Sequence, residues 1–117
     1  MKIEIYHNPR CSKSRATLAL LEEKGIEPNV IEYLTTPPSK KKLKAILKAL
    51  ACQPRDIMRC KQDQYHEQNL GEPSLTNDQL LDAIIADPIL LERPIVCNGE
   101  RAAIGRPPEN VLAILDS

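Results

Sequence analysis

The stretch KIEIYHNPRCSKSR, residues 2–15, decides the fold class and contains the cysteine with the most unusual surroundings. KIEIY alternates apolar and polar residues and ends at the turn signal His-Asn-Pro, which predicts a first strand over about residues 2–6. A helix is expected from Ser12 to Lys24, with Gly25 as its C-terminal cap. The chain therefore passes from strand to helix through a loop that carries Cys11.

Further apolar runs complete a sheet. NVIEYL, residues 29–34, is rich in β-branched and aromatic residues and predicts a second strand, parallel to the first across a right-handed crossover. Residues 94–97 and 101–104 flank Asn98-Gly99, a strong type I′ turn signal, and so predict a β-hairpin.

The middle and the end of the chain are predicted to be helical. Ser39 can cap a helix with a run of lysines on its solvated face, and Thr76 with Gln79 forms a capping box for a later helix. Between them we expect a short helix around residues 54–60 and a polar loop over residues 61–74. A last helix opens at Pro107-Pro108-Glu109. The residues expected to face inward are Leu43, Ile46, Leu47, Leu50, Leu80, Leu81, Ile84, Ile85, Val111, Leu112 and Leu115.

The order of elements is thus β-α-β, a helical insertion, and β-β-α. A parallel pair followed by an antiparallel hairpin and a closing helix matches the thioredoxin-like arrangement, an α/β fold with a mixed sheet. We expect a single thioredoxin-like domain over residues 1–117, with a helical lobe at about residues 39–91.

Charge and composition exclude several classes of protein. Sixteen basic residues balance sixteen acidic ones, so no global field favours binding to nucleic acid or to an anionic membrane. The N-terminal residues are too charged for a secretory signal, and no run of about 18 apolar residues exists, so we expect a cytoplasmic protein. In that compartment Cys11, Cys52, Cys60 and Cys97 are expected to be thiols, and their spacing does not favour a metal site.

Cys11 is predicted to ionise easily. At the start of a helix, free backbone N–H groups and the helix dipole favour a negative charge. Arg10, Lys13 and Arg15 add positive charge, so the sequence predicts a lowered pKa. Ser14 stands where a C-x-x-C motif would have its second thiol, so a thiol from outside this loop must resolve Cys11, and whether Cys60 could do so is left open. A cysteine-phosphatase loop is also disfavoured, because it needs an arginine at the sixth position after the cysteine and Arg15 is at the fourth position after Cys11.

Each neighbour of Cys11 has an ordinary structural interpretation as well. The Ser14 hydroxyl either bonds locally to the backbone or donates to the Cys11 sulfur. His7 is either a polar residue at the end of a strand or part of the thiolate's hydrogen-bond network. For Cys52, Cys60 and Cys97, a purely structural role is the better interpretation.

Three arginines could form an anion site. Arg59, Arg93 and Arg106 taken singly are ordinary surface charges, but together they would supply forked donors for a tetrahedral oxyanion. The Arg93-Pro94 bond precedes the predicted hairpin, where a cis peptide is possible.

Five segments, in this order, carry a resemblance to a known family: HNPRCSKSR, IEYLTTPP, MRCK, LLERPIV and AIGRPPE. They resemble a short, thioredoxin-like branch of the glutaredoxin-coupled arsenate reductases. The resemblance implies reduction of arsenate to arsenite with glutathione as co-substrate, glutaredoxin as partner and no bound cofactor. It also implies that Cys11 is the nucleophile, that His7, Ser14 and Arg15 activate it, and that Arg59, Arg93 and Arg106 bind the oxyanion.

Two other functions are compatible with the sequence. One is a glutathione-dependent thiol oxidoreductase that acts on another substrate, with the arginines binding carboxylates. The other is a non-catalytic protein-binding module that uses the lysine-rich helix or the helical lobe. In that module Cys11 would titrate near its ordinary value of about 8.5.

Overall fold

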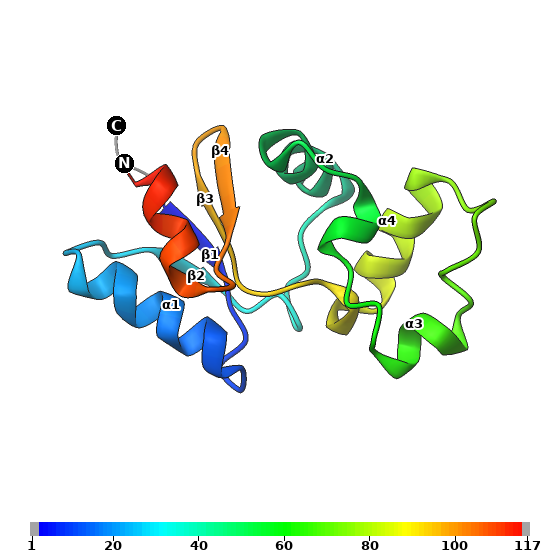
Figure 1. Ribbon diagram of the computed structural model, residues 1–117, viewed down its shortest axis with the longest axis horizontal. Helices are drawn as coiled ribbons and strands as arrows, with labels where there is room; N and C mark the ends of the chain where they lie inside the picture. Colours follow the sequence, from blue (N-terminus) through cyan, green and yellow to red (C-terminus); the bar gives the residue numbers. More distant parts are fainter. Residues whose placement is uncertain (1–2, 116–117) are drawn as a thin grey trace. The chain divides into compact units, whose positions relative to one another are not determined.

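The structure is a computed structural model that describes residues 3–115, in which the chain divides into two compact units (Figure 1). Met1–Thr36 and Arg93–Ser117 form the first, which we call the sheet unit. Pro37–Glu92 form the second, the helical unit, and this segment corresponds in sequence to the lobe expected at residues 39–91. That the whole chain folds as one domain stays a prediction.

The sheet unit is built on four strands in the order β2-β1-β3-β4. Their bounds are Ile3–Tyr6 for β1, Asn29–Ile31 for β2, Ile95–Asn98 for β3 and Arg101–Ile104 for β4. β1 pairs with β2 in parallel and with β3 antiparallel, and β3 and β4 form the hairpin. This confirms the predicted thioredoxin-like mixed sheet. The predicted start of the first strand, residue 2, lies outside the described residues.

Two helices cover one face of this sheet (Figure 1). They are α1, Ser12–Glu23, which follows β1, and η3, a 3₁₀-helix over Pro108–Ile114. α1 ends at Glu23 with Lys24 as its C-cap, one residue earlier than predicted. Gly25 follows with a φ of 77°, the left-handed conformation that glycine adopts without a Cβ clash. The core between the helices and the sheet consists of Ile3, Ile5, Leu21, Val96, Val111 and Ile114.

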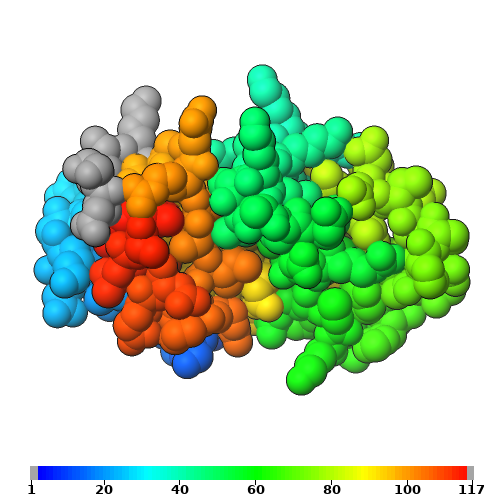
Figure 2. Space-filling view, turned by 45° about the horizontal axis from the view of Figure 1, so that its top comes forward, coloured from blue at the N-terminus to red at the C-terminus, as the bar shows by residue number. Residues whose placement is uncertain are grey.

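The closing helix differs from the prediction in its buried stripe. Val111 and Ile114 are buried, whereas Leu112 and Leu115 are only half-buried. A 3₁₀-helix has three residues per turn, so residues i and i+3 share a face. η3 lies beside β4, as the orange and red surface of Figure 2 shows, and the Asn98 amide donates to the carbonyl of Ile114 across 2.6 Å.

Two predicted boundaries in the sheet unit are wrong. The second strand ends at Ile31, whose carbonyl accepts from His7 N–H at 2.8 Å; the chain then turns instead of extending to residue 34. The hairpin turn is centred on Gly99 and Glu100, because Asn98 still pairs with Arg101. Gly99 has a φ of 63° but Glu100 does not have a positive φ, which excludes the type I′ turn.

The helical unit contains three α-helices and two short 3₁₀-helices among the described residues. They are α2 (Lys40–Leu50), η1 (Pro54–Ile57), α3 (Asp63–Glu67), α4 (Asn77–Ala86) and η2 (Pro88–Leu90). The predicted caps are confirmed: Ser39 Oγ accepts from Lys42 N–H at 3.1 Å, and Thr76 and Gln79 form a reciprocal capping box. None of the helices in the described part of the chain is long and apolar enough to cross a membrane.

The predicted loop over residues 61–74 was wrong in part, because it contains α3. This helix is only five residues long, which is too short for a helical pattern of apolar residues to be visible in the sequence. Tyr65 anchors it and is 8% exposed, and Leu70, just beyond its end, is 6% exposed. Packing of these two side chains stabilises the short helix.

Candidate functional site

Cys11 is the N-cap of α1, with an extended backbone at φ −95° and ψ 123°. Its carbonyl accepts the first helical hydrogen bond, from Arg15 N–H at 3.0 Å. The side chain of Cys11 makes no N-cap hydrogen bond, but the backbone N–H groups of Lys13 and Ser14 help to lower the pKa of its thiol. At most helix N-termini a side-chain oxygen stands at this position; here a thiol does.

The surroundings of Cys11 favour the thiolate. Partial burial by itself would raise the pKa of the thiol, because it disfavours the charged form. The backbone N–H groups of Ser14 and Lys13 and the hydrogen bond and charge of Arg93 outweigh burial, so the pKa of Cys11 lies below its ordinary value. The pKa of Cys11 is thus lowered, which is the direction predicted from the sequence.

Two arginines of the sheet unit meet at the sulfur. Arg93 donates to Cys11 Sγ, and Arg106 Nη1 lies 3.9 Å from the same atom. Arg106 Nη1 also donates to the carbonyl of Arg93 at 3.2 Å, which ties the two residues together. Each arginine precedes a cis proline, Pro94 and Pro107, and only the first of these cis bonds was foreseen.

Ser14 and His7 form a buried pair behind the cysteine. Ser14 Oγ lies 2.6 Å from His7 Nδ1 and accepts a hydrogen bond from Asn8 N–H at 3.0 Å. The hydroxyl is therefore engaged with the strand–helix loop, and Ser14 influences Cys11 through its backbone N–H group. Burial lowers the pKa of His7, and Arg15 lowers it further, although Glu32 acts in the opposite direction. His7 is accordingly held neutral.

The remaining predicted site residues have other partners. Arg15 is exposed, and its Nη1 donates to the carbonyl of Pro9 at 2.8 Å, which closes the HNPRC loop over the start of α1. Arg59 belongs to the helical unit, where its Nε lies 4.0 Å from a carboxylate oxygen of Glu92. Arg59 Nη1 is buried and has no hydrogen-bond partner among the described residues.

The other three cysteines are free thiols in different settings. Cys97 is buried in β3, and Cys60 is exposed with its sulfur 3.6 Å from the Met58 carbonyl. Burial, with a contribution from Asp56, raises the pKa of Cys52, the reverse of the effect at Cys11. No group of three or more histidine, cysteine or acidic side chains within residues 3–115 could hold a metal ion.

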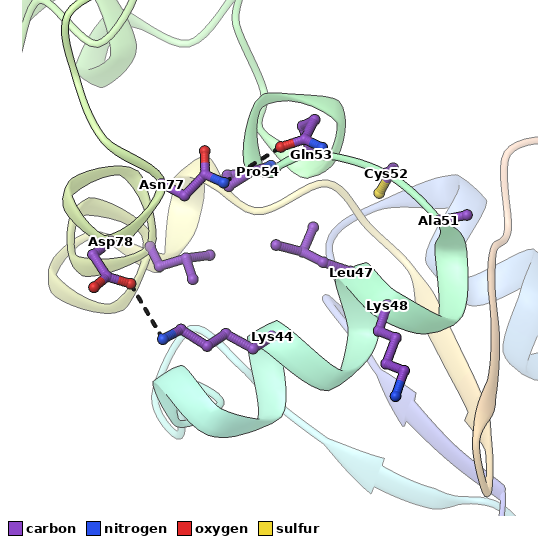
Figure 3. Close-up of a pocket in the computed structure, with 10 residues that line it drawn as sticks. Lys44, Leu47, Lys48, Ala51, Cys52, Gln53, Pro54, Asn77 and Asp78 are labelled. Carbon is purple, nitrogen blue, oxygen red and sulfur yellow. Dashed lines mark hydrogen bonds and ion pairs between the residues drawn. The ribbon is translucent and has the colours of Figure 1, made fainter.

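Cys52 lines a surface cavity of about 520 Å³ in the helical unit (Figure 3). An ion pair between Lys44 and Asp78 at 3.3 Å and a hydrogen bond from Asn77 to Gln53 at 3.4 Å bridge α2, η1 and α4 around it. Its charged side chains are already paired or open to solvent, and its thiol is not activated. The cavity therefore lacks the chemistry found at Cys11.

Three residues that shape the site were not predicted from the sequence. Asn8 is buried, and its Oδ1 accepts from Arg10 N–H at 3.0 Å, an Asx turn for which Asn-Pro was the available signal. Thr17 and Gly105 touch each other, with Thr17 Oγ1 3.4 Å from the Gly105 carbonyl. No local signal reveals a contact between residues so distant in sequence.

Comparisons with known proteins agree on one family. The ArsC family pattern matches residues 6–114. The chain is 54% identical over 115 residues to a protein of Neisseria meningitidis serogroup A named arsenate reductase, covering 97% of this chain and 98% of that one. It is 50% identical over 115 residues to the uncharacterized protein YfgD of Escherichia coli K12, covering 97% of both.

A solved structure extends the agreement to three dimensions. The structure of an arsenate reductase from Vibrio cholerae superposes with a TM-score of 0.95 at 52% identity, covering 98% of each chain. Family pattern, relatives and structure all span nearly the whole chain. The chain therefore belongs to the ArsC family.

Proposed function

We propose that this protein reduces arsenate to arsenite, with Cys11 as the nucleophile and glutathione and glutaredoxin as the reductants. The observation that carries the proposal is the convergence of Arg93 and Arg106 on a cysteine whose pKa is lowered. An oxyanion that approaches the thiolate would meet guanidinium donors at the same place. The similarity to proteins named arsenate reductase supports arsenate as that oxyanion.

The first step is nucleophilic attack by the Cys11 thiolate on arsenic. A sulfur–arsenic bond forms, and an arsenate hydroxyl takes up a proton and leaves as water. Arg93 and Arg106 balance the charge of the remaining oxygens, because guanidinium groups donate to oxyanions in a forked geometry. The product is a Cys11–arsenate adduct in which arsenic is still As(V).

The second step needs a thiol from outside the chain, because serine stands at position 14, where a dithiol motif would have a second cysteine. Glutathione attacks the Cys11 sulfur and forms a disulfide, and the electron pair of the sulfur–arsenic bond stays on arsenic. Arsenic becomes As(III) and leaves as arsenite, while the two thiols are oxidised together. Glutaredoxin then reduces the mixed disulfide on Cys11, without any bound cofactor.

Arg59 keeps its expected role as an oxyanion donor in this proposal, as the family resemblance implies. Its Nη1 is buried and has no hydrogen-bond partner among the described residues, so it is a donor that a ligand could satisfy. Arg15 and the His7–Ser14 pair act indirectly, since they hold the loop and the first turn of α1 that carry Cys11. A cytoplasmic location fits this chemistry, because glutathione keeps thiols reduced there.

The test is arsenite production from arsenate in the presence of glutathione and glutaredoxin. Wild type and Cys60→Ser should be active, because Cys60 is an exposed thiol outside the cysteine loop. Cys11→Ser should have no activity; arsenite formation at the wild-type rate would overturn the assignment. If the wild type forms arsenite equally fast without glutathione, the assignment of glutathione as reductant is wrong, but the assignment of Cys11 as nucleophile is not. Reduction of a glutathionylated peptide without arsenate turnover would identify a thiol oxidoreductase instead.

A further inference from the structure

Thr17 is a buried polar residue on the helix that carries Cys11. Its side chain is 0% exposed, and its Oγ1 donates to the carbonyl of Lys13 at 2.8 Å, one turn earlier in α1. The same oxygen lies 3.4 Å from the carbonyl of Gly105, at the end of β4. Thr17 is thus the side chain at which α1 meets the segment that leads to Arg106.

Gly105 leaves no room for a larger residue. A Cβ on Gly105 would lie 2.8 Å from Pro94 Cγ and 3.0 Å from the Thr17 methyl group, and it would collide with Thr17 Oγ1. Carbon atoms normally approach to about 3.5–4.0 Å, so the surrounding segments would have to separate by roughly 1 Å. Gly105 does not have the positive φ of Gly25 and Gly99, so close approach explains the glycine.

The contact links α1, which carries Cys11, to the two segments that carry Arg93 and Arg106. Gly105 N–H donates to the Pro94 carbonyl at 2.9 Å, which ties the two Arg-Pro segments together. Arg106 follows Gly105 directly, and its Nη1 contacts both the Arg93 carbonyl and Cys11 Sγ. The separation between α1 and Gly105 therefore sets how closely the two guanidinium groups approach the cysteine.

We propose that Thr17 and Gly105 are positioning residues whose contact holds α1 and the two Arg-Pro segments at the distance from which Arg93 and Arg106 reach Cys11. The alternative is ordinary packing, in which the pair stabilises the fold without influencing the sulfur. The proposal rests on the proposed role of Cys11 as nucleophile. Its test measures the ionisation of Cys11 and not turnover, so that the positioning proposal and the proposed function can fail separately.

The decisive variant is Gly105→Ala. The Cys11 pKa is measured from thiolate absorbance against pH, after subtraction of the same titration of the matching Cys11→Ser protein. Because the arginines would move away from the sulfur, the thiolate-to-thiol ratio at fixed pH should fall at least roughly threefold. Gly71→Ala is the matched control, since a Cβ there would meet Tyr65 at an ordinary 3.6 Å, and it should titrate like the wild type.

Two variants of Thr17 separate positioning from packing. Thr17→Ser keeps the hydroxyl and should retain the wild-type titration. Thr17→Ala removes the contact without adding atoms and should lower the thiolate-to-thiol ratio in the same direction as Gly105→Ala, which keeps the test valid if Gly105→Ala does not fold. A folded Gly105→Ala or Thr17→Ala protein of reduced stability with an unchanged Cys11 titration would overturn the proposal. A wild type with an easily ionised Cys11 that does not reduce arsenate would overturn the proposed function only.

Discussion

Arg106 Nη1 lies 3.9 Å from Cys11 Sγ although 95 positions separate the two residues in the chain. The register of the sheet explains the meeting. Tyr6, at the end of β1, pairs with Ile95 at the start of β3, and Ile95 pairs with Ile104 at the end of β4. The segments that follow β1, precede β3 and follow β4 therefore lie at the same end of the strands. They carry Cys11, Arg93 and Arg106 respectively.

Replacing either arginine should make the Cys11 thiol less acidic. We expect Arg93→Ala to raise the Cys11 pKa, because it removes both a hydrogen bond and a nearby positive charge. Arg106→Ala should raise it less, since its contact with the sulfur is longer, at 3.9 Å. Thiolate absorbance against pH measures both changes, with the exposed Lys41→Ala as control. An Arg93→Ala protein that titrates like the wild type would contradict this account of the site.

Ser14→Ala should lower the stability of the protein, whereas its effect on the pKa of Cys11 should be small. The substitution leaves the buried Asn8 N–H and His7 Nδ1 without their common partner, which costs about 1–3 kcal/mol for each unsatisfied group. The backbone N–H of Ser14 remains, so the Cys11 pKa should rise less than in Arg93→Ala. Urea unfolding gives the stability, and Ser12→Ala, an exposed serine on the same turn, is the control. Equal stability of the two variants would show that the buried pair is unimportant.

Because of His7, the protein should be less stable in mild acid than at neutral pH. Burial is the main reason that the folded-state pKa of His7 lies below its ordinary 6.5, so the unfolded chain binds more protons between the two values. The contribution of His7 to the free energy of unfolding is then complete above pH 6.5 and falls as the pH drops from 6.5 to the folded-state pKa. His7→Asn keeps a hydrogen-bonding group without a titrating ring and should flatten this part of the profile.

Urea unfolding at several pH values on both sides of 6.5 measures the effect. His66→Asn is the control, because His66 is exposed, and it should keep the wild-type profile. If His7→Asn and the wild type lose stability in parallel as the pH falls, His7 is not the group responsible.

The positive charges beside Cys11 should determine which thiols react fastest with a mixed disulfide on this residue. Arg10 and Lys13 are exposed and flank Cys11 in the chain, and exposed charges act over a Debye length of about 8–10 Å. A mixed disulfide on Cys11 should therefore react faster with an anionic thiol such as mercaptopropionate than with cationic cysteamine. The double variant Arg10→Ala/Lys13→Ala should reduce this preference about threefold to tenfold at low salt. The released aromatic thiol of a thionitrobenzoate disulfide reports the rate.

Lys41→Ala/Lys48→Ala removes two exposed charges from α2 and is the matched control for that experiment. The preference should also shrink as salt is added, since screening acts on exposed charges. A preference that the double variant at Arg10 and Lys13 leaves unchanged would assign the selection to other residues.

Local signals in the sequence were sufficient for most of the fold. The alternation in KIEIY, the Ser39 cap and the Thr76–Gln79 capping box act within a few residues, and each element was predicted correctly. The errors occurred where packing decides. α3 is too short to have a visible period, and η3 winds as a 3₁₀-helix with Val111 and Ile114 on its buried face.

The sequence by itself determined that Cys11 would begin a helix among cations and without a second cysteine in its own loop, because these features depend on neighbouring residues. Only the tertiary structure decided which groups reach the sulfur. Arg93 and Arg106 arrive there through strand register, and Thr17 can approach Gly105 because position 105 has no side chain. Such contacts depend on the distance between elements, and that distance is set by the packing of the whole sheet unit rather than by any local pattern.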